Sequence, residues 1–399
     1  MTPEIKERIA QIRRGEVPEG YKNTKAGIYP IMWEFCTVGD CIQEYRKLSN
    51  DISYMPVYSS SRKGLMPQSE YYDGKETIET NIGYKVVPVG YATYRHMSDD
   101  DIFHFNVNCI GTPILVSSEY PVFTASTKSD LGFLIPVLNS TARFRYFCRT
   151  QKLGGTRTRL YLKNLMTYQL CVPDVIEQQK IAAILTAQDK VIELKEKLIA
   201  EKQRQKKYLM QQLFTKDIQK IRQLSEIADI IMGQSPISAS YNEVNAGLPL
   251  IQGNADIENR IPHPRMYTTE PTRMCKPGNI LLSVRAPVGS VALSTMTACI
   301  GRGVCAIYAG SYQNYLYQYL LFVENKWGRV SQGSTFESIS GDEIAKLKVP
   351  ISTQAEKVSE VLSTADREID LLQQELEQEK QKKKALMQLL LTGIVRVNL

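Results

Sequence analysis

Residues 206–215 read KKYLMQQLFT, and residues 383–392 read KKALMQLLLT. Seven of these ten positions are identical, at an offset of 177 residues (383 minus 206). The match continues upstream without a gap as far as Val172-Pro173, which aligns with Val349-Pro350. Self-similarity of this length indicates a tandem duplication, and a duplication determines the architecture of the chain.

Both copies of the repeat have the pattern of a long helix. Each begins just after Pro173 or Pro350 and contains no further proline or glycine before position 216 or 393. Apolar residues recur at steps of three, four and seven, which is typical of a narrow coiled-coil stripe. The stripe is interrupted by lysines, so the seam is not uniformly apolar. These are Lys202, Lys206 and Lys383.

The length of the helices predicts how they pack. Residues 174–215 number 42 and would span about 63 Å if wholly helical. A helix of that length cannot bury its apolar stripe alone, and the two copies are matched in length. We therefore expect antiparallel pairing of the two copies as coiled-coil spacers, with a pseudo-two-fold relation between them.

The segments between the helices differ from them in composition. Residues 33–170 and 223–347 are rich in Gly, Pro, Tyr, Ser, Val and Ile, with short strand-like runs broken by turn signals. Each is predicted to be an α+β domain, and the two do not align with each other beyond their edges. The expected boundaries are an N-terminal segment at 1–32, a first head at 33–172, a first helix at 173–216, a second head at 217–349, a second helix at 350–393 and a tail at 394–399.

The second head contains the most distinctive local sequences. They are QSP at 234–236, IQGN at 251–254, LLSVRAPVG at 281–289 and GRG at 301–303. An arginine in a glycine-flanked loop can reach guanine or a phosphate, and amide side chains suit adenine edges. The same glycines and prolines also form ordinary turns, and an arginine near a strand end is often part of a surface ion pair. The candidate DNA contacts here are Gln234, Ser235, Gln252, Asn254, Arg285 and Arg302.

The order head, helix, head, helix resembles the specificity subunit of type I restriction–modification systems. The four motifs of the second head are closely similar to that family's target recognition domains. The first head is similar more loosely, through VYSSSRKGL at 57–65, Tyr94-Arg95 and GGTR at 154–157. The resemblance extends from about residue 33 to residue 393. Candidate DNA contacts in the first head are Ser60, Arg62, Lys63, Tyr94, Arg95, His96 and Arg157.

The resemblance implies a division of labour. Each target recognition domain would read one half of a split double-stranded DNA site, with the gap set by the paired helices. Two methyltransferase subunits would bind along the helices and modify adenine, and two restriction subunits can join them. Those partners are expected to use S-adenosylmethionine, ATP and Mg²⁺, whereas this chain is expected to have no cofactor, metal or catalytic residue. The candidate partner-binding residues are Leu209, Leu213, Leu386 and Leu390.

Two other classes of protein compete with a DNA reader. One is a coiled-coil scaffold whose heads bind proteins, and the other is a DNA-cleaving enzyme. The chain has no Asn/Asp-Pro-Pro-Tyr/Phe segment for adenine methylation and no GxxxxGK[ST] phosphate loop. A nuclease-like match at Pro173-Asp174 and Glu193-Leu194-Lys195 falls on the predicted helix, with its carboxylates roughly 28 Å apart along the axis. These absences argue against an enzyme.

Composition limits the possible location and partners. The 399 residues can form two globular domains, and a formal net charge of +7 permits an anionic partner without proving one. No apolar run approaches the roughly 20 residues that cross a bilayer, and the N-terminus lacks a signal-peptide pattern. The eight cysteines form no CxxC pair. We therefore expect a cytoplasmic protein with reduced thiols.

Overall fold

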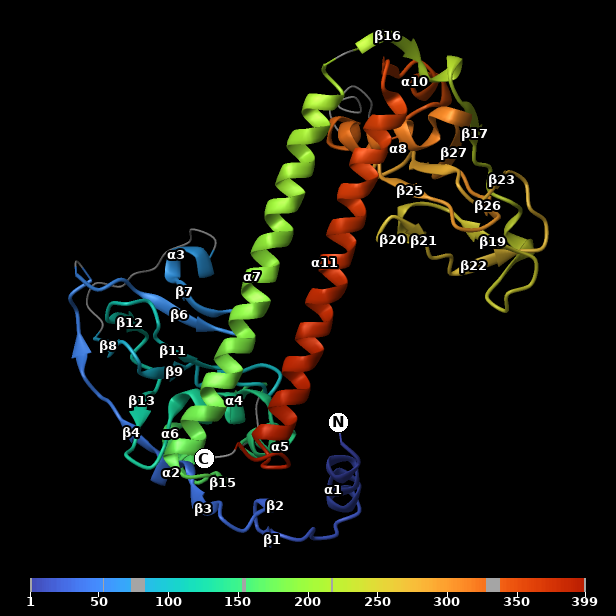
Figure 1. Ribbon diagram of the computed structural model, residues 1–399. Coiled ribbons are helices and arrows are strands. Elements are labelled where there is room, and N and C mark those ends of the chain that lie inside the picture. Colours follow the sequence, from blue (N-terminus) through green and yellow to red (C-terminus); the bar gives the residue numbers. More distant parts are fainter. Residues whose placement is uncertain are drawn as a thin grey trace. The chain divides into compact units, whose positions relative to one another are not determined.

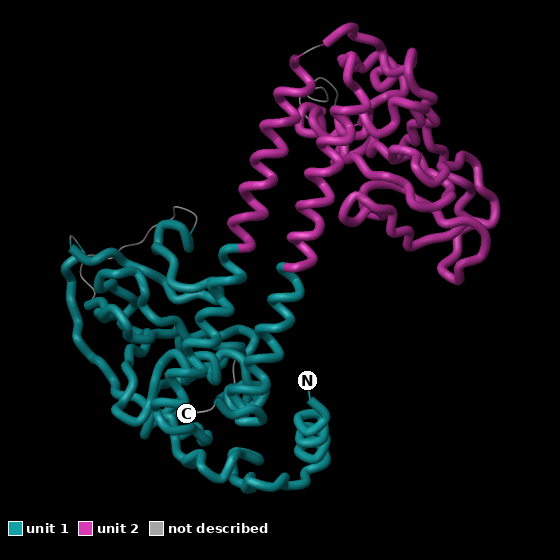
Figure 2. The backbone as a smooth tube through the Cα atoms, in the orientation of Figure 1, with its two compact units in different colours: residues 1–194, 376–399 teal, residues 195–375 magenta. Residues whose placement is uncertain are grey.

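The computed structural model describes residues 2–52, 54–72, 83–152, 156–216, 218–327 and 338–397. The chain divides into two compact units, unit 1 from residues 1–194 and 376–399 and unit 2 from residues 195–375 (Figures 1 and 2). Each unit contains one head and a stretch of both long helices, α7 (Val175–Leu213) and α11 (Ala355–Leu390). The predicted mixture of helices and strands is therefore observed. Gly154 and Gly155, which belong to a predicted motif of the first head, lie outside the described residues.

The two long helices are shorter than the repeats that predict them. The side chain of Asp174 accepts a hydrogen bond from the backbone N–H of Glu177 at 2.9 Å, which satisfies a free donor at the start of α7. In the second copy, the residues around Pro350 form strand β28 (Lys348–Ser352), which pairs with β16 (Ile218–Gln223). Helix α11 therefore begins several residues later than the sequence pattern indicates.

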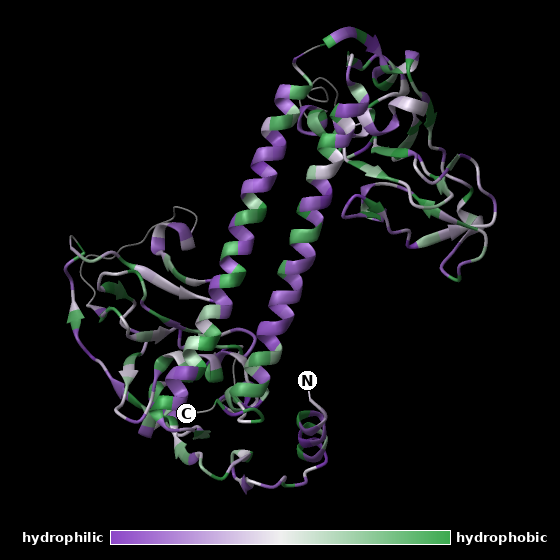
Figure 3. Cartoon of the chain, in the orientation of Figure 1, coloured by the Kyte–Doolittle hydropathy of each residue, from purple (hydrophilic) through white to green (hydrophobic). Residues whose placement is uncertain are grey.

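Within each unit the two long helices run antiparallel and are joined by charged pairs. In unit 2, Lys195 pairs with Glu375 at 2.6 Å, Lys202 with Glu368 at 2.6 Å, and Lys206 with Asp366. In unit 1, Lys383 pairs with Asp189. The three lysines that interrupt the apolar stripe thus each have a carboxylate partner on the other helix. Figure 3 shows hydrophilic residues along much of both helices.

The head of unit 1 is built from short strands in several small sheets. Its largest sheet has the order β11-β9-β13-β4, and a second has the order β12-β8-β5. The aromatic core lies on β9, β11 and α5, where the rings of Tyr94 and Phe105 are 4.5 Å apart and Phe144 packs edge-on against Phe105. The elements are α1 (Pro3–Arg13), β1 (Tyr21–Thr24), β2 (Gly27–Pro30), β3 (Glu34–Thr37), α2 (Val38–Cys41), β4 (Ile42–Glu44), β5 (Leu48–Ser49), β6 (Tyr58–Ser61), β7 (Gly64–Pro67), α3 (Gln68–Tyr71), β8 (Tyr84–Val87), β9 (Ala92–Tyr94), β10 (Met97–Ser98), β11 (Phe105–Val107), β12 (Ile114–Val116), β13 (Val122–Ala125), α4 (Leu131–Ser140), α5 (Ala142–Thr150), β14 (Thr158–Arg159), α6 (Leu162–Leu165) and β15 (Gln169–Val172).

The head of unit 2 has two main sheets, ordered β17-β27-β24-β25 and β18-β22-β19-β26-β23. Strand β24 is buried along its whole length, and its alternate residues face two separate apolar clusters. Phe214, just after α7, packs against Tyr315 of α8 and so attaches the helix to the head. The elements are β17 (Asp229–Met232), β18 (Tyr241–Asn242), β19 (Leu248–Ile251), β20 (Ile257–Glu258), β21 (Ile261–Pro262), β22 (Met266–Thr268), β23 (Met274–Cys275), β24 (Ile280–Ser283), β25 (Val291–Leu293), β26 (Ala298–Ile300), β27 (Val304–Tyr308), α8 (Gln313–Val323) and α10 (Gly341–Ala345).

The two ends of the chain meet in unit 1. Tyr21 donates its hydroxyl hydrogen bond to the carbonyl oxygen of Gly393 at 2.7 Å, and Arg8 donates to that of Ile394 at 2.6 Å. Arg396 makes a two-pronged ion pair with the fully buried Glu177, with both N···O distances at 2.6 Å. The C-terminal tail is therefore part of the fold of unit 1. Across the described ranges, no helix has both the length and the apolarity to span a membrane.

Candidate nucleic-acid interface

Five of the six candidate contacts in the second head line a single pocket of unit 2. The pocket has a volume of about 540 Å³. These five are Ser235, Gln252, Asn254, Arg285 and Arg302. Gln234 is not part of the lining, but its backbone N–H donates to Ile300 at 2.9 Å and its carbonyl accepts from Thr272, so it anchors the adjoining loop. Residues from four separate motifs thus converge on one concave surface.

Close packing of two loops explains the glycines around this pocket. Strands β19 and β26 pair in parallel, and the Gly303 N–H donates to the carbonyl oxygen of Gln252 at 3.1 Å just beyond them. A Cβ on Gly303 would lie 2.3 Å from that carbonyl oxygen, and a Cβ on Gly233 would lie 2.1 Å from that of Gly301. Only glycine allows the two loops to approach this closely. The loops therefore present Gln252 and Arg302 side by side.

The polar side chains of this pocket differ in how firmly they are held. The backbone N and the Nε of Arg302 both lie 3.3 Å from Oγ of Ser235, which orients the arginine. Arg285 and Gln252 are exposed, and with the described residues neither side chain forms a hydrogen bond or ion pair. Their donors and acceptors are available to a ligand.

Asp256 supports the pocket, and the sequence analysis did not single it out. Its carboxylate is nearly buried and accepts from the backbone N–H of Gln252 at 2.8 Å and from Nε of Arg265 at 3.0 Å. Its backbone oxygen also accepts from His263 N–H at 2.7 Å. Asp256 therefore fixes the loop that carries Gln252 and Asn254, and it holds the exposed Arg265 beside the pocket.

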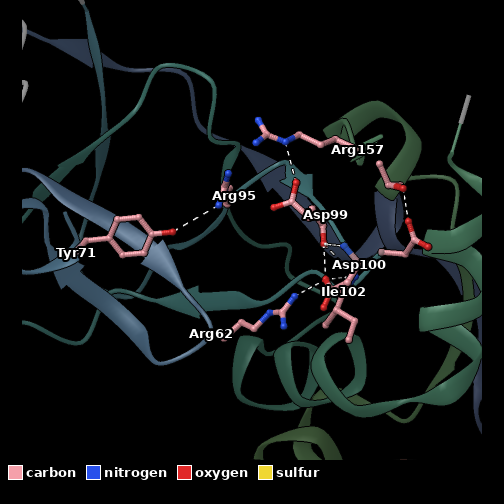
Figure 4. A network of polar contacts seen from close by, with 10 residues as sticks. Arg62, Tyr71, Arg95, Asp99, Asp100, Ile102 and Arg157 are labelled. Atoms are coloured by element: carbon pink, nitrogen blue, oxygen red, sulfur yellow. Dashed lines mark hydrogen bonds and ion pairs between the residues drawn. The ribbon is translucent and has the colours of Figure 1, made fainter. Parts of the chain in front are cut away.

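A second pocket, of about 590 Å³, lies in unit 1 (Figure 4). It is lined by four of the seven candidate contacts in the first head. They are Ser60, Arg62, Lys63 and Arg95. Its remaining wall includes a turn that carries Asp99 and Asp100, to which the sequence analysis assigned no role. Arg157 lies outside the lining, but its Nε donates to Asp99 at 2.8 Å. The structure thus places Arg157 at the edge of the pocket.

Carboxylates hold Arg62 and Arg157 in place, whereas Arg95 donates to the hydroxyl of Tyr71 at 3.5 Å. Arg62 donates to Asp100, which also accepts from the hydroxyl of Ser98 at 2.9 Å. These hydrogen bonds, that from Arg62 above all, lower the pKa of Asp100 to about 2. The same pair raises the pKa of Arg62. Both groups are therefore charged across the physiological pH range. The pocket of unit 1 thus contains arginine–aspartate ion pairs, whereas the lining of the unit 2 pocket combines arginines with amide side chains.

Three predicted contacts in the first head are buried in the structure, although Ser60 still forms part of the pocket lining. Tyr94 has no exposed surface, and its hydroxyl donates to the carbonyl oxygen of Leu160 at 2.9 Å, so its role is structural. Ser60 is 3% exposed, and its hydroxyl accepts from the amide of Asn106 at 2.8 Å. His96 is 4% exposed, and burial lowers its pKa. Their side chains have almost no surface with which to meet DNA.

The four leucines predicted to bind partners all pack within the chain. Leu390 is 4% exposed and belongs to the core of unit 1, against which Leu386 also packs. Leu209 and Leu213 pack against the core of unit 2. All four side chains are thus used within the chain itself. Among the described residues, no cluster of His, Cys, Asp or Glu is placed to hold a metal ion.

The organisation of the chain agrees with that of a known family. The family model described as the type I restriction modification DNA specificity domain matches residues 7–203 and 216–381. The two matches together include most of the chain and reproduce its two-copy organisation. The chain therefore belongs to the type I restriction–modification DNA specificity family, as its sequence motifs indicate, and recognition of a DNA target is the role of that family.

Individual relatives extend this result over nearly the whole chain. A putative type I restriction enzyme MjaX specificity subunit from Methanocaldococcus jannaschii is 28% identical over 418 residues, covering 95% of this chain and 97% of that protein. A chain solved to explain complex assembly and conformational transition of the type I R-M system matches with a TM-score of 0.61 and 20% identity, covering 92% of this chain and 99% of that chain. The type I S subunit from M. genitalium matches with a TM-score of 0.59 and 12% identity, covering 92% and 96%. These solved structures share the fold.

Proposed function

We propose that this chain reads a bipartite DNA target for a type I restriction–modification complex, one half with each pocket. The observation that supports this most directly is the convergence of candidate contacts from four sequence motifs in the pocket of unit 2. Residues 33–172 and 217–349 are then the two target recognition domains. Each unit contains one of the two pockets that are lined by candidate contacts, so each half of the target has its own reader.

The pocket of unit 2 has the chemistry for direct reading of base edges. Arg285 and Arg302 can donate in pairs to O6 and N7 of guanine, and Gln252 and Asn254 can pair with N6 and N7 of adenine. The arrangement is fixed before DNA arrives, since Ser235 orients Arg302 and glycines join the two loops. A pre-arranged site avoids part of the entropic cost of binding.

In the pocket of unit 1, both members of each ion pair are proposed to contact DNA bases, the arginine as a donor and the carboxylate as an acceptor. Arg62 and Arg157 are each bonded to a carboxylate of the same turn, Asp100 and Asp99 respectively. Carboxylates accept hydrogen bonds from the N4 amino group of cytosine, which arginines cannot do. A base pair that offers an acceptor to the arginine and a donor to the aspartate can bind here. A phosphate would be repelled by the negative charges of the two aspartates.

The long helices are proposed to act as coiled-coil spacers that set the gap between the two half-sites. Their antiparallel charged pairs support this within each unit. Methyltransferase subunits are proposed to dock on apolar side chains that the helices leave exposed. In unit 1 these are Ile184, Val191 and Leu194 of α7, and in unit 2 they are Leu198 and Tyr208. The partners would supply the catalysis together with S-adenosylmethionine, ATP and Mg²⁺.

Single-molecule methylation mapping tests this function. Genomic DNA is compared from cells that express a neighbouring methyltransferase gene with and without this chain. We expect a split motif with methylated adenine in both halves that disappears when the chain is deleted. An active methyltransferase whose motif is the same without the chain would contradict the proposal and favour a protein-binding scaffold.

A further inference from the structure

One part of the chain has no acidic residue at all. Between Asp130 and Asp174, residues 131–173 contain seven lysines and arginines and not one aspartate or glutamate. Seven positive charges equal the formal net charge of the whole 399-residue chain. All of this segment belongs to unit 1, so it is a local concentration of positive charge within one head. A concentration of this kind is the footprint of an anionic partner.

Three cations of this segment lie on helix α5 or just after it. Arg145 and Arg149 are four residues apart and so share one face of α5, and the exposed Lys152 follows two residues after the helix ends at Thr150. These three residues are called the row below. Phe144 and Cys148, on the other face, are 1% exposed and belong to the core of unit 1. The buried face therefore anchors the helix, and the row of cations is held on the surface.

The cations of this row have no internal task. With the described residues, none of the three side chains makes a hydrogen bond or an ion pair, and Arg145 and Arg149 are exposed. Arg143 on the same helix is different, because it donates to the carbonyl oxygens of Gln169 at 2.6 Å and Lys25 at 2.8 Å. Tyr146, beside the row, is 70% exposed and adds a free phenol.

The segment that carries the row is connected to the proposed DNA pocket of unit 1. Strand β14, which follows α5 in the chain, pairs with β10, and both residues of β10 line the pocket. Burial, together with the nearby charge of Asp101, raises the pKa of Cys148 on α5 to about 12. Asp101 also accepts a hydrogen bond from Thr158 of β14 and follows the two aspartates of the pocket wall. Asp101 thus links the acidic turn of the pocket wall to β14, the strand that follows α5.

We propose that Arg145, Arg149 and Lys152 bind the phosphate backbone of the duplex whose base edges enter the pocket of unit 1. This inference rests on the proposed function and extends the DNA interface beyond the pocket. The rise of an α-helix separates Arg145 from Arg149 by roughly 6 Å along the axis, a distance suited to neighbouring phosphates of one strand. Phosphate contacts fix the position of a protein on DNA without conveying sequence. The row therefore contributes affinity and orientation, and the pocket contributes specificity.

The test uses the full chain assembled with its methyltransferase subunits. Binding of a duplex that contains the mapped motif, and of one that lacks it, is measured at several salt concentrations for R145Q, R149Q and the triple variant R145Q/R149Q/K152Q. Each lost phosphate contact should reduce the slope of log K against log salt by about 0.9, so by up to about 2.7 in the triple variant. Both duplexes should weaken by the same factor, and the methylated motif should not change.

R14Q is the matched control, because Arg14 is an exposed arginine of unit 1 whose charge is already paired with Glu7 and Glu16. It removes the same charge and should leave the salt slope unchanged. A wild-type salt slope in the triple variant would overturn the inference. So would weaker binding of the methyltransferase to the triple variant together with a normal salt slope of the assembled complex, because the row would then contact a protein and not DNA. The pocket variant R302A distinguishes a failure of this inference from a failure of the proposed function. If R302A alters the methylated motif while the α5 variants leave the salt slope unchanged, only this inference fails.

Discussion

Gln252 and Arg302 can meet a ligand because the backbone beneath them is held from several sides. Asp256 accepts from the N–H of Gln252, Gly303 donates to its carbonyl oxygen, and Ser235 contacts Arg302. Small changes in these supports should therefore alter recognition without touching the residues proposed to read DNA. Tyr94 of unit 1 is the opposite case, because its ring is buried and its hydroxyl hydrogen-bonds within the core and not to a ligand.

Gly303→Ala should damage recognition of the unit 2 half-site. Its Cβ would lie 2.3 Å from the carbonyl oxygen of Gln252 and force the two loops apart, at a cost of about 1–3 kcal/mol. Thermal unfolding measures the loss, and methylation mapping should show relaxed specificity in one half only. Gly253→Ala is the matched control, because a Cβ there meets nothing within 4 Å. Equal effects of the two substitutions would refute this explanation of the glycine.

Asp256→Ala should have a similar consequence by a different route. It removes two acceptors from a nearly buried site and leaves the N–H of Gln252 and the guanidinium of Arg265 without their partner, which costs about 1–3 kcal/mol. We expect relaxed recognition of the unit 2 half-site with an intact unit 1 half-site. Asp256→Asn, which keeps an acceptor for Gln252, should retain more specificity. If the asparagine variant recognised DNA no better than the alanine variant, the acceptor would not be what positions the loop.

His96 should make the stability of the protein depend on pH. Burial lowers its folded pKa below the ordinary value of 6.5, so the unfolded chain binds the proton more readily. The contribution of His96 to stability is then fully present above pH 6.5 and is lost as the pH falls below that value. Denaturation midpoints measured from pH 7.5 to pH 5 should fall less steeply for His96→Gln than for the wild type. Parallel curves would show that His96 is not responsible.

At the scale of elements, the helices were predictable because their period can be read directly from the sequence. The duplication and the absence of proline and glycine located α7 and α11 to within a few residues. The partner-binding leucines stay a prediction, because the pattern shows which positions are apolar and not which neighbour covers them. Leu390 is covered by the core of unit 1, whereas Ile184 on α7 is 36% exposed. That difference arises from tertiary packing alone.

The contact between α7 and the C-terminal tail should be important for the stability of unit 1. Arg396→Ala would leave the carboxylate of Glu177, which is 0% exposed, without its cation, and breaking a buried pair of this kind costs about 3–5 kcal/mol. Denaturant unfolding of the full chain measures this loss. Lys190→Ala, which breaks an exposed pair with Glu193 on the same helix, should cost less than about 1 kcal/mol. A difference of less than about 1 kcal/mol between the two variants would mean that water replaces Arg396.

For the whole molecule, the sequence indicates two different readers on a duplicated frame, and the structure shows a pocket in each unit. The unit 2 pocket could be anticipated because its motifs are rich in glycine, arginine and amides. The aspartates could not be anticipated. Asp99 and Asp100 pair with arginines that lie far from them in sequence, and no motif marks Asp256 as the acceptor for the backbone N–H of Gln252. The acid-free segment 131–173 was a readable signal for the basic face of α5.

The central claim is that the two pockets read different halves of one target, and methylation mapping of two single variants tests it most directly. Arg302→Ala changes the pocket of unit 2, and Arg62→Ala changes that of unit 1. Each is expressed with the methyltransferase, and assembly of the complex is verified. Arg302→Ala should relax one half of the split motif, by about 1–3 kcal/mol of discrimination at a base, and Arg62→Ala should relax the other half. If both variants relaxed the same half, or if assembled complexes kept the wild-type motif in both cases, the two-reader account would be contradicted.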